Sequence, residues 1–244
     1  MSTTSTKPTL TADLTVGEIV AAWPTLARVF EQFKVDYCCG GKRALRQVCT
    51  ELRLDPVSVV ALLQASVDAL ASAAGSELDV SAYSLTELAD HIERTHHNYV
   101  KAELPRLCEM ADRVARKHSW RDERLVDVAE TTLALAAEMF SHMDKEEKIL
   151  FPLVRQIERG SSDQFHCGSI ANPIRQMETE HESAGQAVAR LRELTDGFAP
   201  AEDACNTHRA LLAGLAEFES DLHRHVHKEN NILFPRALQV AGNN

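Results

Sequence analysis

A duplicated eleven-residue pattern constrains the fold of this chain more strongly than any other feature of its sequence. Residues 142–152 read HMDKEEKILFP and residues 225–235 read HVHKENNILFP, so seven positions agree at a separation of 83 residues. Because residues four apart on a helix share one face, a histidine four residues before a glutamate can supply two ligands to one metal site. Both copies contain such a pair, His142 with Glu146 and His225 with Glu229.

Histidines upstream of the two copies repeat at nearly the same interval. His97 precedes His142 by 45 residues and His181 precedes His225 by 44, which predicts one further helix before each copy. Four helices would then direct four imidazoles and two carboxylates to one place, which predicts a two-metal site inside a four-helix bundle. The adjacent His96 is an alternative to His97 in this assignment.

The predicted ligand set limits the choice of metal. Four neutral imidazoles and two carboxylates suit iron, manganese or zinc rather than calcium or magnesium, which prefer oxygen ligands throughout. The two carboxylates can bridge two metals while two imidazoles cap each metal, which leaves positions open for water, O₂ or NO. The candidates for hydrogen bonds to the ligand imidazoles are Asp144, Glu147 and Glu180.

A simpler interpretation treats these features as ordinary helix packing. The repeated ILFP could be a shared packing device at a helix end, and a single histidine on an apolar helix face is more often a core or surface residue than a ligand. The chain contains eleven histidines. The coincidence of two duplicated pairs with two upstream histidines at nearly equal spacing favours the metal site.

Helical periodicity without strand alternation predicts an all-α fold. The expected segments are a polar, flexible tail over residues 1–13, a small three-helix N-terminal domain over 14–73, a linker over 74–83 and a four-helix bundle over 84–240.

Local signals place several helix ends. Thr15 with Glu18 and Ser84 with Glu87 form capping boxes, and Asp55 before Pro56 marks a further helix start. The first helix is expected to continue to about Lys34. Pro105 is expected to kink or break the helix that carries His97. The stretch 159–171 is the clearest loop of the larger domain.

Composition limits the binding partners and the cellular compartment that we expect for this chain. With 26 basic and 36 acidic side chains the formal charge is −10, which argues against general affinity for nucleic acid or anionic membranes. Neither a secretory signal nor a stretch long enough to span a bilayer is apparent, so we expect a cytoplasmic protein whose six cysteines are thiols.

Two of these cysteines, Cys38 and Cys39, are adjacent in the sequence DYCCGG. A helix expected to begin near Lys42 would lower their thiol pKa, which favours a thiol role in redox chemistry or iron hand-over. The alternative is a tight turn that happens to contain two small residues. The remaining cysteines are scattered singly and are expected to be ordinary thiols: Cys49, Cys108, Cys167 and Cys205.

With HxxxE present twice, residues 84–240 resemble the hemerythrin-like family. The DYCCGG motif at residues 36–41 extends the resemblance over nearly the whole chain, to the di-iron repair-of-iron-centres (RIC) proteins of the YtfE/ScdA type. The resemblance implies a cofactor of two non-heme iron ions in an oxo-bridged centre, with Glu146 and Glu229 as bridges. The implied iron ligands are His97, His142, Glu146, His181, His225 and Glu229.

The resemblance also implies a function in nitrosative and oxidative stress, in which the protein supports repair of damaged iron-sulfur clusters and binds NO at the di-iron centre. A cytoplasmic NO-sequestering protein linked to denitrification, a di-iron NO reductase and a purely structural bundle are the alternatives. Animal hemerythrins have an additional histidine ligand without a clear counterpart here, so reversible O₂ carriage is disfavoured.

The implied partners are NO or O₂ as small ligands and damaged iron-sulfur proteins as clients, with no nucleic acid and no membrane. A homodimer is one alternative for the oligomeric state.

Overall fold

The computed structural model describes residues 8–71, 80–160 and 169–242, and the regular structure in these ranges is helical apart from one isolated bridge between Thr15 and Ala44. The all-α prediction is confirmed. Contacts divide the chain into two compact units, residues 1–84 with 226–235 and residues 85–225 with 236–244. No described helix is both long and apolar enough to cross a membrane.

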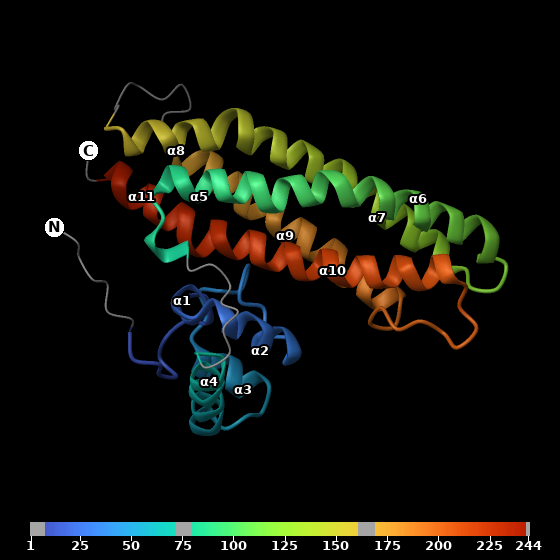
Figure 1. The fold of residues 1–244 in the computed structure, drawn as a ribbon, viewed down its shortest axis with the longest axis horizontal. Helices are drawn as coiled ribbons and strands as arrows, with labels where there is room; N and C mark the ends of the chain where they lie inside the picture. The colour runs from blue at the N-terminus through green and yellow to red at the C-terminus, as the bar shows by residue number, and fades with distance from the viewer. Residues whose placement is uncertain (1–7, 72–79, 161–168, 243–244) are drawn as a thin grey trace. The chain divides into compact units, whose positions relative to one another are not determined.

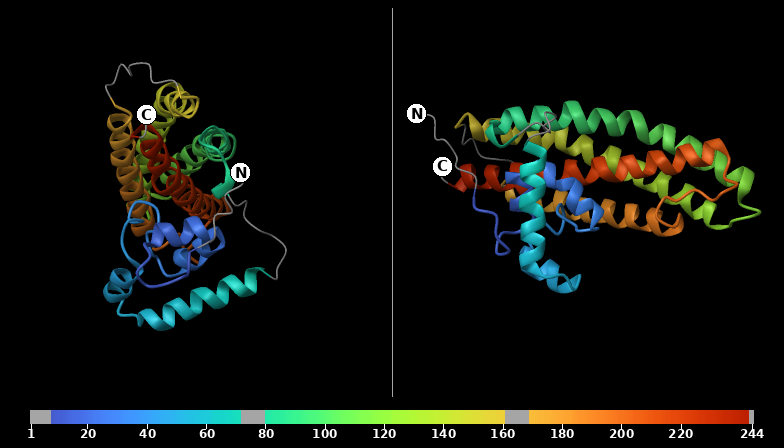
Figure 2. Two further views of the ribbon diagram at one scale, coloured as in Figure 1. Left: turned by 90° about the vertical axis from the view of Figure 1, so that its left-hand side faces the viewer. Right: turned by 60° about the horizontal axis from the view of Figure 1, so that its bottom comes forward.

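Four long helical runs form the bundle, and the left view of Figure 2 looks along them (Figures 1 and 2). Three runs consist of two α-helices joined by a π-helical turn, and the remaining run is the single helix α9. In chain order the elements are α5 (Leu85–Ile92), η3 (Glu93–His97) and α6 (Asn98–His118); α7 (Arg124–Lys145), η4 (Glu146–Leu150) and α8 (Phe151–Glu158); α9 (Ala171–Leu194); and α10 (Asn206–Lys228), η5 (Glu229–Leu233) and α11 (Phe234–Gly242).

Each run buries an apolar stripe with the three- and four-residue spacing of an amphipathic helix. In α9 this stripe contains one polar residue, His181, at a position where the pattern calls for a core side chain. The buried residues of α9 are Ile174, Met177, His181, Ala184, Val188, Leu191 and Leu194. Hydrophobic packing of the stripe therefore carries the imidazole into the interior of the bundle.

The π-helical turns coincide with predicted ligands. The turn η3 ends at His97, η4 begins at Glu146 and η5 begins at Glu229. Pro152 and Pro235 follow η4 and η5. Proline has no N–H to donate to the carbonyl four residues earlier, and its ring clashes with that carbonyl. A π-helical turn therefore costs less free energy here than elsewhere in the helix. Such π-bulges occur frequently at functional sites.

The predicted break of the helix at Pro105 is wrong, and a kink there stays a prediction. Helix α6 continues through Pro105 from Asn98 to His118, and the irregular turn lies before it, in η3. The loss of a single intrahelical hydrogen bond at Pro105 is offset by the buried side chains on both sides, Val100, Leu104, Leu107 and Ala111 among them.

Within residues 8–71 of the small unit, the structure has four α-helices where the sequence predicted three, because Pro24 divides the first. The elements in this range are α1 (Val16–Ala22), η1 (Pro24–Leu26), α2 (Ala27–Gln32), α3 (Leu45–Glu51) and α4 (Pro56–Ala71). The first capping box is confirmed: the Glu18 amide donates to Thr15 Oγ1 at 3.2 Å, and the Thr15 amide donates to Glu18 Oε2 at 2.8 Å. Asp55 Oδ2 likewise accepts from the Ser58 amide at 2.9 Å, confirming the predicted start of α4.

Several predicted connecting segments have a different structure or lie outside the described residues. Leu10 is buried, and the Arg46 amide donates to the Ala12 carbonyl at 2.9 Å, so residues 10–13 pack on α3 rather than forming part of a flexible tail. In the predicted linker, Val80–Ala82 forms the 3₁₀ turn η2. Residues 1–7, 72–79 and 161–168, which include most of the predicted loop, lie outside the described residues.

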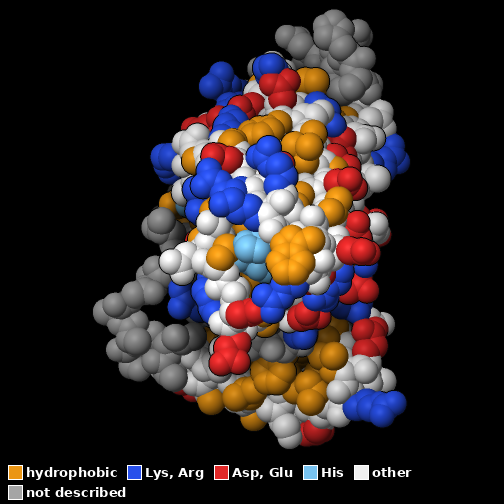
Figure 3. Space-filling model, turned by 90° about the vertical axis from the view of Figure 1, so that its right-hand side faces the viewer, with side chains coloured by type: hydrophobic (Ala, Val, Ile, Leu, Met, Phe, Trp, Pro, Cys, Tyr) orange, Lys and Arg blue, Asp and Glu red, His pale blue; other side chains and the backbone are white. Residues whose placement is uncertain are grey.

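The small unit has an apolar surface at the ends of α2 and α3 and along α4, and Figure 3 shows hydrophobic side chains gathered at its lower edge. A cavity of about 20 Å³ lies among these elements. The core of the unit therefore reaches solvent at this surface. The exposed large hydrophobic side chains among the described residues of this surface are Phe33, Leu52, Leu54, Val57 and Leu62.

The segment 226–235 belongs to the small unit through contacts with the loop that contains DYCCGG. Asn231 Nδ2 donates to the Cys38 carbonyl at 3.0 Å. A Cβ on Gly17 or Gly41 would lie only 2.4 Å or 2.3 Å from Asn231 Oδ1. The same Cβ atoms would lie 2.9 Å from the Gly41 carbonyl oxygen and 2.7 Å from the Tyr37 carbonyl oxygen, respectively, so both positions favour glycine because backbone atoms approach closely.

His227 makes the second polar contact of this segment. Its Nδ1 lies 3.3 Å from the Tyr37 carbonyl, and its ring meets the Tyr37 ring edge-on at 5.5 Å. Burial lowers the pKa of His227 from its ordinary 6.5 to about 4.

We predict that His227 makes the protein less stable as the pH falls from about 6.5 to about 4. In this window the unfolded chain takes up a proton that folded His227 does not, so stability is present above the unfolded pKa and is lost towards the folded pKa. The full effect is about 3 kcal/mol. Urea unfolding of wild type and His227→Gln, at equal metal content, should show a flatter pH dependence in the variant; equal pH slopes would contradict the prediction.

Candidate metal centre

The structure brings all six predicted ligands together in two overlapping groups. One group contains His97, Glu146, His225 and Glu229, and the other contains His142, Glu146, His181 and Glu229; within each group the ligand atoms lie within 4.8 Å of one another. Each of the six side chains is at most 2% exposed. Both glutamates belong to both groups, whereas each group takes one histidine from each repeat.

Glu146 lies between imidazoles of the two groups. Its Oε2 atom is 3.3 Å from His97 Nε2 and 3.2 Å from His142 Nε2. His142 and Glu146 are one turn apart at the junction of α7 and η4, and His97 ends η3. A carboxylate in this position can bind two cations at once, as a bridge requires.

The donor atoms fit metal cations. His142 Nδ1 lies 3.0 Å from Glu180 Oε2, and a carboxylate only accepts, so in the neutral imidazole Nε2 carries the lone pair. The His142 Nε2 atom lies 3.1 Å from His181 Nε2 and 3.2 Å from Glu146 Oε2. Lone pairs this close repel unless a proton or a metal cation lies between them, and a set of buried imidazoles and carboxylates suits a transition metal.

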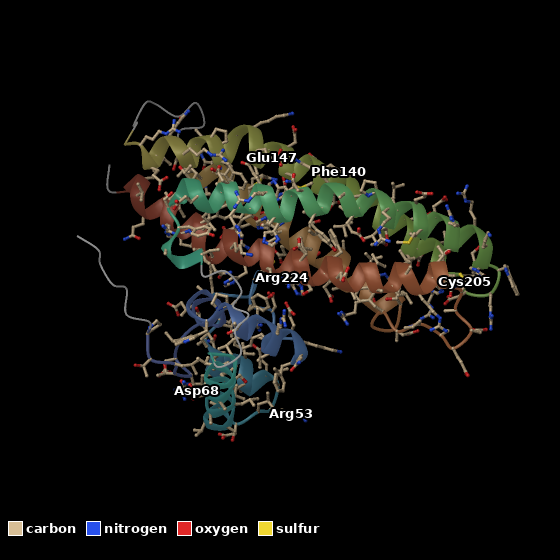
Figure 4. The ribbon with its side chains drawn as sticks, in the orientation of Figure 1. Arg53, Asp68, Phe140, Glu147, Cys205 and Arg224 are labelled. Carbon is tan, nitrogen blue, oxygen red and sulfur yellow. The ribbon has the colours of Figure 1, made fainter. Side chains whose placement is uncertain are left out.

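Two carboxylates outside the ligand groups orient ligand imidazoles, as the sequence predicted for Glu147 and Glu180. Glu147, from η4, accepts from His97 Nδ1 at 2.7 Å and from Lys101 Nζ at 2.6 Å (Figure 4). Burial alone would raise the pKa of Glu147, but these hydrogen bonds hold it below its usual value. The anionic carboxylate therefore fixes the proton on Nδ1 and directs the His97 Nε2 lone pair inward.

Glu180 plays the corresponding part for His142. It accepts from His142 Nδ1, from Gln176 at 2.8 Å and from the Lys145 ammonium. Burial opposes ionisation, yet these donors lower the pKa of Glu180 to about 2. Asp144, the third residue predicted for this role, instead pairs with Lys148 at 2.5 Å on the exposed face of the helix.

His96, the alternative to His97, lies outside both ligand groups. It is buried, and its Nδ1 atom lies 2.9 Å from Asp221 Oδ1. The two neighbouring histidines therefore have different partners: His97 points to Glu146 and Glu147, and His96 points to Asp221.

The cysteine pair differs from its prediction. Helix α3 begins at Leu45, so no helix N-terminus directly follows the pair. Cys38 is buried, and its pKa is raised well above the usual value by a hydrogen bond with Cys39, by burial and by the charge of Asp36. The lowered pKa predicted for Cys38 is thus wrong, because the hydrogen bond with Cys39 and burial favour the neutral thiol, which also donates to Asp36 Oδ1 at 3.2 Å. Cys39 is exposed, and a thiol role for the pair stays a prediction.

The other cysteines are free thiols where the structure describes them: Cys49 is buried, and Cys108 and Cys205 are partly buried. Cys167 lies outside the described residues.

We predict that Glu147→Gln lowers metal affinity roughly 10- to 100-fold, because a neutral amide no longer fixes the His97 tautomer. The measurement is metal retained against a competing chelator. Glu109→Gln is the matched control, since Glu109 pairs with Arg113 on the exposed face of α6 and touches no ligand. Equal metal retention by the two variants would show that Glu147 does not orient His97.

Comparison with known proteins agrees with this geometry. The family of the hemerythrin HHE cation binding domain matches residues 88–237, and a domain of unknown function (DUF542) matches residues 12–67. The iron-sulfur cluster repair proteins YtfE of Musicola paradisiaca, Yersinia pseudotuberculosis and Yersinia pestis are each 38% identical over 224 residues, which cover 92% of this chain and 96% of theirs. The chain therefore belongs to the hemerythrin HHE cation-binding family and, within it, to the two-domain group of the YtfE proteins.

Proposed function

We propose that this chain holds two non-heme iron ions and supports the repair of damaged iron-sulfur clusters. The observation that carries the proposal is the pair of buried ligand groups that share Glu146 and Glu229. The named function of the YtfE relatives supplies the repair role and points to iron rather than manganese or zinc.

Bound iron supplies redox chemistry and a source of iron for a damaged cluster. The chain's own residues bind and orient it: Glu146 and Glu229 join the two positions, and Glu147 and Glu180 hold protons on the outer nitrogens of two ligand imidazoles. The complete burial of Glu146 and Glu229 keeps bulk water away from the bridging oxygens.

We further propose that NO binds at this centre. Each group offers four protein donors, and iron bound by few protein ligands keeps positions for a small ligand. The same argument admits O₂. The same proposal includes an oxo-bridged form of the iron pair, a role in the stress response and iron-sulfur proteins as clients, all of which the family resemblance implies. A cytoplasmic location also belongs to it, and a homodimer is one alternative for the oligomeric state.

We predict about two irons per chain in protein purified without oxygen, and a larger loss of iron from Glu146→Ala than from His97→Ala, because Glu146 serves both positions. Iron content, together with the optical spectrum of the oxidised protein, measures this. One tightly held zinc in the wild type would overturn the di-iron proposal. Comparable iron retention in the two variants would argue against bridging by Glu146.

We predict that iron-loaded wild-type protein restores activity to an enzyme whose iron-sulfur cluster has been damaged, and that His142→Ala does not, because it removes a ligand of one iron position. Reactivation is measured with Glu109→Gln as the control that retains the site. Failure of fully loaded wild type would count against repair.

Titration with NO in the same preparation separates the alternatives. Nitrosylation with all iron retained and no reactivation would favour sequestration. N₂O formed with a reductant would favour NO reduction.

A further inference from the structure

His96 is a buried histidine that the metal site does not use as a ligand. Its Nδ1 atom lies 2.9 Å from Asp221 Oδ1, and because a carboxylate only accepts, the imidazole donates. Arg224, on the same helix as Asp221, lies 3.9 Å from that oxygen (Figure 4). The Asp221 carboxylate thus holds the His96 ring in one orientation.

The His96 ring lies against a metal ligand. It is parallel to the ring of His225, with an interplanar angle of 2° and ring centroids 5.2 Å apart. Asp221 stands four residues before His225 on α10, so the residue that anchors His96 and the ligand that His96 touches share one helix face. A parallel ring anchored in this way restricts rotation of the His225 imidazole about its Cβ–Cγ bond.

The other repeat has a different residue at the position that corresponds to His96. His97 and His181 correspond at a separation of 84 residues, so His96 corresponds to Glu180. Glu180 orients His142, the ligand that corresponds to His225, by accepting its Nδ1 proton. In one half a carboxylate therefore orients the ligand directly, and in the other half an imidazole held by Asp221 takes that position.

We propose that His96, anchored by Asp221, is a positioning residue for the ligand His225, and that retention of metal at the position formed by His97 and His225 depends on this stacked pair. The inference rests on the proposed iron pair. Its consequence is an unequal site: loosening His96 weakens one metal position and leaves the position of His142 and His181, oriented by Glu180, intact.

The test is iron retention against a ferrous-iron chelator, in full-length protein loaded with two Fe(II) per chain. In His96→Ala one iron should be removed at a roughly 10- to 100-fold lower chelator concentration than in wild type, with a plateau near one iron per chain. Mössbauer spectra of the variant should show one iron environment changed and the other preserved. Far-UV circular dichroism of the metal-free variants checks that they fold.

Four further variants separate positioning from packing. His96→Phe keeps a planar ring beside His225 but loses the hydrogen bond to Asp221, so it should retain no more iron than Asp221→Ala. Asp221→Ala should resemble His96→Ala, and the double variant should be no worse than either single variant, because Asp221 acts through His96. His91→Ala removes another buried imidazole, one that meets His96 edge-on at 6.2 Å, and should retain both irons.

The proposal is overturned if His96→Ala retains iron like wild type, if it loses both irons together, if His96→Phe retains iron like wild type, or if His91→Ala loses as much iron as His96→Ala. Wild-type protein that cannot be loaded with two irons would instead refute the proposed function itself. The two failures are therefore distinct.

Discussion

The structure depends on placing two carboxylates, Glu146 and Glu229, in the centre of a helical bundle. Burial of an ionised carboxylate is costly unless opposite charge and hydrogen-bond donors compensate for the lost hydration. The groups that surround these two carboxylates are four imidazoles, three of which lie at the edge of a π-helical turn or one turn from it. Cations bound between the two carboxylates would offset the free-energy cost of burying both of them. The arrangement of the centre therefore suits metal binding.

Metal binding and bundle stability are consequently coupled. The six ligands come from all four helical runs, so a metal pair would connect every run to its neighbours in a region where apolar side chains give way to polar ones. Because the ligands converge only in the folded state, metal stabilises that state by mass action. Glu147 and Glu180 extend the coupling outward, since Lys101 and Lys145 hold these carboxylates at the surface of the site.

The repeat spacing was enough to predict which six side chains converge, because residues four apart on a helix share one face. The same reasoning could not predict the π-helical turns, since the energy of a widened turn depends on which carbonyls tertiary packing leaves available. It also extended the first helix to about Lys34, although α1 ends before Pro24. It placed the start of the next helix near Lys42, but α3 begins at Leu45, so the helix N-terminus expected beside Cys38 lies farther along the chain. The choice between His96 and His97 required coordinates: two adjacent residues differ by about 100° around a helix, and η3 changes that phase.

The exchange of histidines between the repeats bears on how such a chain could arise. Each ligand group takes one imidazole from the first repeat and one from the second, and the two glutamates come from different repeats. One repeat alone therefore holds neither complete group. A half-length chain with one repeat could form this centre only by pairing with a second copy of itself, whereas one chain that contains both repeats leaves each half free to orient its ligands differently, as His96 and Glu180 do.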